Sequence, residues 1–243
     1  MAYYIFDFKD VYVNSRYIRL RYIKTSPKNI KLTHIKSTVP ASGKLGVNAG
    51  FFDDASQGVQ SICIQNSSCV LGGGSSDFAT GYYNNNSSGG HISKGTLVWD
   101  DAWRTYRLQV IENAGQLIIG NPDNYWAQGG FSMHLQSDTS WQNMLSSGKE
   151  SVNDHAPNTN YNRTGLLYGN SLNIYLVISE TTCTADEFRT ACKYIDTNNG
   201  LQGIFLDGAT ATQMNVPASG YSWTSGSSRK LPAMIEVVHN VDL

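Results

Sequence analysis

An apolar strand, a capped helix and a second apolar strand follow one another within residues 172–206. Leu172–Ser179 has the apolar, β-branched character of a buried strand, and Thr184-Ala185-Asp186-Glu187 has the pattern of a helix capping box. Gly200 marks the stop of the helix, and Ile204–Leu206 follows as the next strand. This order predicts two parallel strands joined by a right-handed crossover. The expected fold class is therefore α+β, with mixed β-sheets and this crossover near the C-terminus.

The remainder of the chain predicts strands rather than helices. Alternation of apolar and polar residues predicts one or two strands in residues 12–24 and another at Ile30–Ile35. Short apolar segments predict strands at Thr96–Trp99, Tyr106–Ile111 and Gln116–Ile119, the last two joined as a hairpin. A chain with 23 glycines and only 15% charged residues suits a single sheet-rich domain with long polar loops.

Positive charge is concentrated at the N-terminal end. Residues 1–44 contain nine Lys or Arg against two Asp, a net charge of +7, so the rest of the chain carries −8 in a total of −1. Because these charges are spread along alternating segments, they indicate a solvated sheet face. A nucleic-acid partner is disfavoured, since no recognised nucleic-acid motif accompanies the charge.

Several function classes are excluded or disfavoured. The histidines form no metal-binding pair and the cysteines no Cys-x-x-Cys spacing, so we expect neither a metal nor another cofactor. No apolar run is long enough to span a membrane. The first residues lack a signal-peptide pattern, which predicts a cytoplasmic protein or a secreted form whose signal has been removed.

One carboxylate follows the second apolar strand directly. Asp207 comes after Ile204–Leu206, and Gly208 with its small and hydroxylated successors leaves room for a ligand. Ligands of α/β proteins commonly bind at the carboxyl ends of strands. The alternative is that Asp207 only caps an Asp-Gly turn.

Three of these segments, taken together, resemble the phosphodiester glycosidase family, and a fourth falls where that family has a Gly-Gly segment. The matching segments keep the family's order over about residues 45–215, and they are Asn48-Ala49-Gly50-Phe51-Phe52, Gly129-Gly130-Phe131, Arg163-Thr164-Gly165 and Leu206-Asp207-Gly208. The sequence departs from the family after Gly208, where Ala209-Thr210-Ala211-Thr212 replaces a tail rich in glycine and serine. The resemblance implies one phosphodiester glycosidase-like domain over residues 1–243, with residues 1–44 as its basic N-terminal strand segment.

The resemblance also implies a reaction, the cleavage of a sugar C1–O bond whose leaving group is a phosphate ester. Arg163 suits the phosphate, because its planar fork pairs with phosphate oxygens. Asp207 suits the developing sugar cation, and Asn48 a sugar hydroxyl or acetamide. The sequence does not identify a second carboxylate, and the candidates are Glu180, Asp53, Asp54 and Asp154. Glu180 is favoured because it ends the strand expected beside Asp207, and its alternative is a surface acid near the start of a helix. The expected substrate-binding residues are Gly50, Phe51, Gly130, His155, Thr164, Gly208, Thr210 and Thr212.

The resulting expectation is a hydrolase acting on a sugar 1-phosphodiester or a nucleotide-linked sugar, with a small phosphorylated ligand as its partner. The alternative is a pocket that sequesters a phosphorylated sugar or nucleotide without cleaving it, or a glycan-recognition module of a phage particle. The changed residues after Gly208 leave both open.

Overall fold

Three β-sheets form the framework of the computed structural model, which describes residues 2–72, 79–226 and 228–243. The first has six strands in the order β1 (Tyr4–Val13), β2 (Arg16–Thr25), β14 (Ile174–Ser179), β13 (Thr164–Tyr168), β15 (Gln202–Phe205) and β12 (Phe131–Ser132). The second has the order β10 (Thr105–Ile111), β9 (Lys94–Asp100), β11 (Tyr125–Gly129), β7 (Cys63–Gln65) and β8 (Ser68–Cys69). The third has the order β17 (Tyr221–Thr224), β16 (Gln213–Val216), β4 (Gly46–Asn48), β18 (Leu231–Val237) and β3 (Ile30–Ser37).

The remaining elements are short. A two-stranded sheet pairs β5 (Phe52–Asp53) with β6 (Gly58–Val59), and the α-helices are α1 (Asp138–Ser147) and α2 (Ala185–Cys192). The 3₁₀ turns are η1 (Pro27–Asn29), η2 (Pro40–Ser42), η3 (Ala114–Gln116), η4 (Lys149–His155), η5 (Ala209–Ala211) and η6 (Pro217–Ser219). None of the helices in the described part of the chain is long and apolar enough to cross a membrane.

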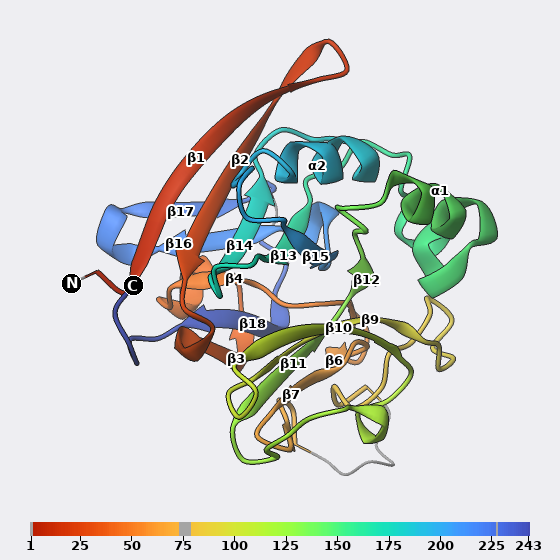
Figure 1. Cartoon of the computed structure of the whole chain (residues 1–243), viewed down its shortest axis with the longest axis vertical. Coiled ribbons are helices and arrows are strands. Elements are labelled where there is room, and N and C mark those ends of the chain that lie inside the picture. Colours follow the sequence, from red (N-terminus) through yellow and green to blue (C-terminus); the bar gives the residue numbers. More distant parts are fainter. Residues whose placement is uncertain (1, 73–78, 227) are drawn as a thin grey trace.

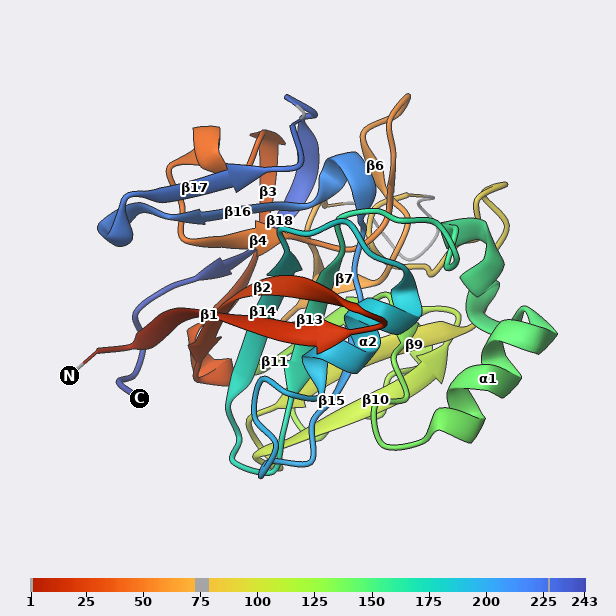
Figure 2. The ribbon, with the colours of Figure 1, turned by 90° about the horizontal axis from the view of Figure 1, so that it is seen from above.

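The central strands β13, β14 and β15 of the six-stranded sheet are covered on both faces, which explains why they are largely apolar. On one face Leu176 and Ile204 pack in a cluster that includes Val47 of the third sheet and Leu97 of the second. On the other face, side chains of the same strands join a cluster with Phe188 of α2 and residues of α1. Figures 1 and 2 show α2 covering this face of the sheet. All six residues of β14 are buried, as expected for a strand enclosed on two sides.

The predicted order of strand, helix and strand is present, but the predicted pairing of the two strands was wrong. β13 lies between β14 and β15 and pairs antiparallel with both, so the two strands run in the same direction without touching. Every ladder between named strands in the described residues is antiparallel, so the expected mixed sheet is not observed. An apolar sequence pattern indicates that a strand is buried, but it does not indicate which strands pair with it in the sheet.

Local predictions had mixed outcomes. The capping box of α2 is confirmed, since the Thr184 side chain accepts from the Glu187 N–H and the Glu187 side chain accepts from the Thr184 N–H. Residues 12–24 contain the end of β1, the turn and nearly all of β2, and the far end of this hairpin extends past the rest of the molecule (Figure 1). The strand predicted at Gln116–Ile119 is wrong. The Gln109 side chain bonds both backbone groups of Ile118 there, in place of a backbone ladder.

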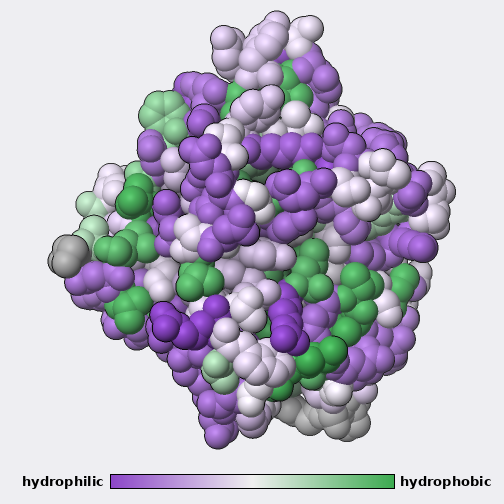
Figure 3. All heavy atoms as spheres, viewed as in Figure 1, coloured by the Kyte–Doolittle hydropathy of each residue, from purple (hydrophilic) through white to green (hydrophobic). Residues whose placement is uncertain are grey.

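Hydrophilic residues cover the upper part of the face in Figure 3, and hydrophobic residues gather toward its lower half, where Figure 1 draws β9 and β10.

Basic residues of the N-terminal segment pair with acidic ones at the surface. Arg19 Nε lies 2.7 Å from Asp10, and Lys44 Nζ lies 2.9 Å from Glu236. These pairs reach acidic residues inside and outside residues 1–44.

Candidate functional site

A cavity of about 290 Å³ lies at the carboxyl end of β15. Its wall combines aromatic side chains with charged ones from three separate parts of the chain. The lining residues are Phe51, Phe131, Asp154, His155, Ala156, Tyr161, Arg163, Phe205, Leu206, Asp207, Gly208, Ala209 and Arg229. Asp207, Arg163, Phe51, His155 and Gly208 are the site residues expected from the sequence that line this cavity.

Asp207 occupies the cavity wall directly beyond β15. The backbone N–H of Leu206 donates to the carbonyl of Thr164, which keeps the chain beside β13 up to this point. The Gly208 N–H donates to Asp207 Oδ1 at 2.8 Å. Burial raises the pKa of Asp207 to about 7, against the opposing effect of the positive charge of Arg229. The carboxyl group therefore changes its protonation near neutral pH.

Arg229 supplies a cation that sequence reasoning missed. It precedes β18 and forms a two-point ion pair with Asp54, with Nε 2.8 Å from Oδ1 and Nη2 2.6 Å from Oδ2. Its Nη1 also donates to the Thr210 hydroxyl at 3.1 Å. Arg229 stands next to Lys230 in a polar stretch of sequence, where a basic residue is usually a solvated surface charge. Nothing in the sequence therefore indicated that Arg229 lines a cavity.

Arg163 is buried, and its guanidinium holds one wall of the cavity together. Nε donates to the carbonyl of Cys183, Nη1 to that of His155, and Nη2 to those of Ala156 and Thr159, at distances of 2.6–3.2 Å. Four of its five N–H donors are thereby used, which leaves one N–H of Nη1. In the described part of the chain Arg163 forms no ion pair with a carboxylate. A buried cation in this state favours an anionic ligand.

A second buried cation lies behind the aromatic wall. Lys94 is fully buried, and its Nζ lies 3.0 Å from His155 Nε2 and 4.8 Å from the centre of the Phe51 ring. Burial lowers the pKa of Lys94 to about 8. Burial, followed by the charges of Lys94 and Arg163, holds the pKa of His155 well below its usual value. His155 is therefore a neutral ring, stacked on Phe51 with 3.8 Å between ring centres.

Asn48 lies behind the cavity wall rather than in it. Its side-chain nitrogen donates to the carbonyls of Ala49 and Asp207, and its oxygen accepts from the Thr164 hydroxyl and the Gln213 N–H. Both ends of the amide are used by the protein, so Asn48 and Thr164 support Asp207 instead of facing a ligand.

The remaining expected residues lie outside the cavity lining. Gly50 and Gly130 allow close packing, since a Cβ on Gly130 would lie 2.0 Å from the Phe205 carbonyl oxygen. Thr212 is buried and donates to the Asn162 carbonyl, whereas Thr210 is exposed beside Arg229.

The expected second carboxylate also lies elsewhere. Glu180 accepts hydrogen bonds from Arg21 Nε at 3.1 Å and from the Tyr221 hydroxyl at 2.7 Å, on a different part of the surface. Asp154, from η4, is the alternative that lines the cavity. Within the described residues, no group of three or more His, Cys, Asp or Glu could hold a metal ion.

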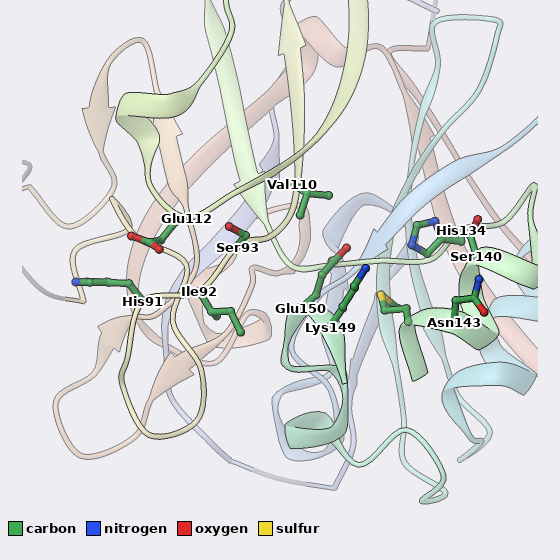
Figure 4. A pocket seen from close by; sticks show the side chains of 11 residues that line it. His91, Ile92, Ser93, Val110, Glu112, His134, Ser140, Asn143, Lys149 and Glu150 are labelled. Carbon is green, nitrogen blue, oxygen red and sulfur yellow. The ribbon is translucent and has the colours of Figure 1, made fainter. Parts of the chain in front are cut away.

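A larger cavity of about 700 Å³ lies between α1 and the end of β10. Figure 4 shows His134, Ser140 and Asn143 on one side of it and Ser93 and Glu112 on the other. Glu150 is committed to the fold, since its Oε2 accepts the N–H groups of Gly95 and Ser132 at 2.8 Å. None of the site residues expected from the sequence lines this cavity.

No protein-family model and no curated protein sequence matches this chain. Among solved structures, the catalytic domain of zebrafish N-acetylglucosamine-1-phosphodiester α-N-acetylglucosaminidase, auto-inhibited by its pro-peptide, is similar with a TM-score of 0.68 and 11% identity. That likeness covers 98% of this chain and 83% of the other. A hypothetical protein from Synechocystis is similar with a TM-score of 0.54 and 11% identity, over 96% of this chain and 62% of the other. At this identity the likeness shows a shared fold.

Proposed function

We propose that this chain is a hydrolase that cleaves the bond between C1 of a sugar and the oxygen of a phosphodiester, in a sugar 1-phosphodiester or a nucleotide-linked sugar. The observation that carries the proposal is Asp207, a carboxyl group whose pKa is raised to about 7 in a cavity that Arg163 and Arg229 also line. Membership of the phosphodiester glycosidase family is part of this proposal. It is supported by the motifs around Asp207 and by the fold shared with a phosphodiester glycosidase domain.

The cations suit the leaving group. The guanidinium of Arg229 and the remaining N–H of Arg163 offer positive charge to a phosphodiester in the cavity. When the C1–O bond breaks, its electron pair stays on the phosphate oxygen, and the cations stabilise that charge. Phosphate esters leave readily, so little help from a general acid is needed.

The carboxylates suit the sugar. Ionised Asp207 stabilises the positive charge that develops at C1, either by electrostatic attraction or by forming a transient bond to C1. A water molecule then attacks C1 and gives up a proton to the second carboxylate, so that the C1–OH bond forms and any bond between Asp207 and C1 breaks, with its electron pair returning to the Asp207 carboxylate. Asp154 takes the place expected for Glu180 as the second carboxylate, because it lines the same cavity.

The test is turnover of two substrates, UDP-N-acetylglucosamine and the methyl phosphodiester of N-acetylglucosamine 1-phosphate. The release of free sugar measures the rate. Asp207→Asn is expected to lower the rate by at least about 100-fold, since the ionised group is lost. Asp123→Asn, at an exposed turn residue, is the matched control and is expected to keep the wild-type rate. Circular dichroism confirms folding of both variants.

Two outcomes would oppose the proposal. Wild-type turnover by Asp207→Asn would remove Asp207 from the chemistry. Tight binding with complete recovery of the intact ligand would instead support the sequestering pocket. The four internal hydrogen bonds of Arg163 favour that second function, because they leave this residue little freedom to follow a reacting phosphate.

A further inference from the structure

Arg229 belongs to the walls of two cavities. Beside the cavity that contains Asp207, a second one of about 630 Å³ is also lined by Arg229 and by its ion-pair partner Asp54. The other charged or titratable residues that line it, within the described part of the chain, are His34, Lys36 and Lys230. The two cavities thus meet at one guanidinium, which the proposed function assigns to the phosphodiester.

The second cavity has an excess of positive charge. Among the described residues that line it, Lys36, Arg229 and Lys230 carry positive charge and Asp54 carries negative charge, a net charge of +2. Partial desolvation, followed by the charge of Lys36, lowers the pKa of the His34 ring below its usual value. In the part of the chain that the structure describes, neither lysine forms an ion pair. Asp54 is already held at two points by Arg229.

The local fold turns these cations toward one place. His34 and Lys36 are two residues apart on β3, so both project from the same side of the strand, and both are exposed. β18 pairs with β3, and its register shifts between Leu231 and Ala233, immediately after Arg229 and Lys230. The two basic residues therefore enter the sheet next to the strand that carries Lys36.

We propose that this second cavity binds the leaving-group half of the substrate, and that this half carries a second phosphate beyond the one that is cleaved from the sugar. The inference rests on the proposed function, because it uses Arg229 to place the scissile phosphodiester. From there the rest of the leaving group extends toward Lys36 and Lys230. A neutral leaving group would leave both ammonium groups without a partner, whereas a diphosphate matches the net charge of +2. A nucleoside diphosphate has this chemistry, as does a pyrophosphate ester without a nucleoside.

Binding of the leaving group alone tests the inference without any turnover. Calorimetry with the wild-type protein compares UDP, UMP, uridine and inorganic pyrophosphate. We expect UDP to bind at least about 10-fold more tightly than UMP, with an affinity that falls as salt rises. Pyrophosphate binding as tightly as UDP identifies a leaving group without a nucleoside, and tighter UDP binding identifies a nucleotide.

The double variant Lys36→Gln/Lys230→Gln is expected to weaken UDP binding by at least about 10-fold and uridine binding little. The matched control is Lys9→Gln/Lys31→Gln, which removes the same charge from exposed positions, one of them on β3 itself. The control corrects for long-range attraction between the ligand and the net charge of the protein. UDP binding no tighter than UMP, or an equal loss in both double variants, overturns the inference.

Turnover separates a failure of this inference from a failure of the proposed function. In Lys36→Gln/Lys230→Gln we expect the KM for UDP-N-acetylglucosamine to rise by a larger factor than the KM for the methyl phosphodiester. Equal effects on the two substrates would overturn the second cavity alone and leave the hydrolase intact. Tight UDP binding by a protein without turnover would keep the second cavity and reject the hydrolase.

Discussion

The side-chain amide of Asn48 donates a hydrogen bond of 2.8 Å to the main-chain carbonyl oxygen of Asp207. This bond joins β4 to the residue that follows β15, and so connects two sheets at the cavity wall. The amide oxygen of Asn48 accepts from Thr164 on β13 and from Gln213 on β16. One buried side chain therefore fixes the position from which the Asp207 carboxyl group enters the cavity.

Asn48→Ala is expected to lower the free energy of unfolding by about 3 kcal/mol, because it leaves buried donors and a carbonyl without partners. Asn48→Asp should cost at least as much, since a carboxylate oxygen would then face the carbonyls of Ala49 and Asp207. Urea unfolding measures both. Asn158→Ala, at an exposed residue, is the control and should change stability by less than about 0.5 kcal/mol. Wild-type stability of Asn48→Asp would contradict this role.

The raised pKa of Asp207 predicts how stability depends on pH. The folded protein binds the Asp207 proton up to about pH 7, and the unfolded chain releases it near pH 3.8. The wild type therefore loses stability from this group as pH rises from about 4 to 7. Asp207→Asn removes the effect, so its stability relative to the wild type should increase by about 2 kcal/mol from pH 4 to pH 8, after allowance for partial exposure.

The comparison with the variant is needed because His155 acts in the opposite direction. Its pKa is held well below 6.5 in the folded protein, so both proteins lose stability from this group as pH falls below about 6.5. That loss cancels in the difference between wild type and Asp207→Asn. Parallel stability curves for the two proteins would show that folding does not raise the pKa of Asp207.

The proposed reaction needs ionised Asp207, so kcat/KM should rise with pH and level off above about pH 7. An initial-rate series from pH 5 to 9 with the methyl phosphodiester measures it. Arg229→Gln removes the positive charge that opposes the effect of burial, so the midpoint should move to higher pH. A midpoint that stays near pH 4 would contradict the assignment.

Ala209 predicts a stabilising substitution. Its φ of 52° places it in the left-handed region. A residue with a Cβ has a conformational free energy about 1–2 kcal/mol less favourable there, whereas glycine adopts this conformation without that cost. Ala209→Gly should raise the free energy of unfolding by about 0.5–1 kcal/mol, the remainder being lost to the greater freedom of glycine in the unfolded chain. Ala41→Gly, in the 3₁₀ turn η2, lacks a positive φ and should destabilise. Opposite signs for the two variants in urea unfolding are the expected result.

Much of the cavity was predictable from the sequence because its residues stand at the ends of recognisable strands. Asp207 follows an apolar run, and Arg163 precedes another. Glu180 was misplaced for a physical reason. The prediction made β14 the neighbour of β15, but β13 lies between them, and the end of β14 lies beside β2, where Glu180 meets Arg21.

Lys94 and Arg229 show where sequence reasoning stops. Lys94 opens a buried strand, a position at which a lysine is normally solvated, and only the tertiary fold encloses it. Arg229 reaches the cavity through an ion pair with Asp54, which is distant in the sequence. Such contacts depend on which loops lie next to one another in the fold. The spacing of hydrophobic residues and the turn residues do not predict that.

The four carbonyl groups held by Arg163 bear on how a ligand enters. The segment from His155 to Thr159 is fastened to this guanidinium by bonds that form when the chain folds, before any ligand arrives. That wall has therefore already lost its conformational freedom, and a ligand that docks against it incurs little further entropy loss. Association of a ligand with this wall should therefore need no prior ordering of residues 155–159.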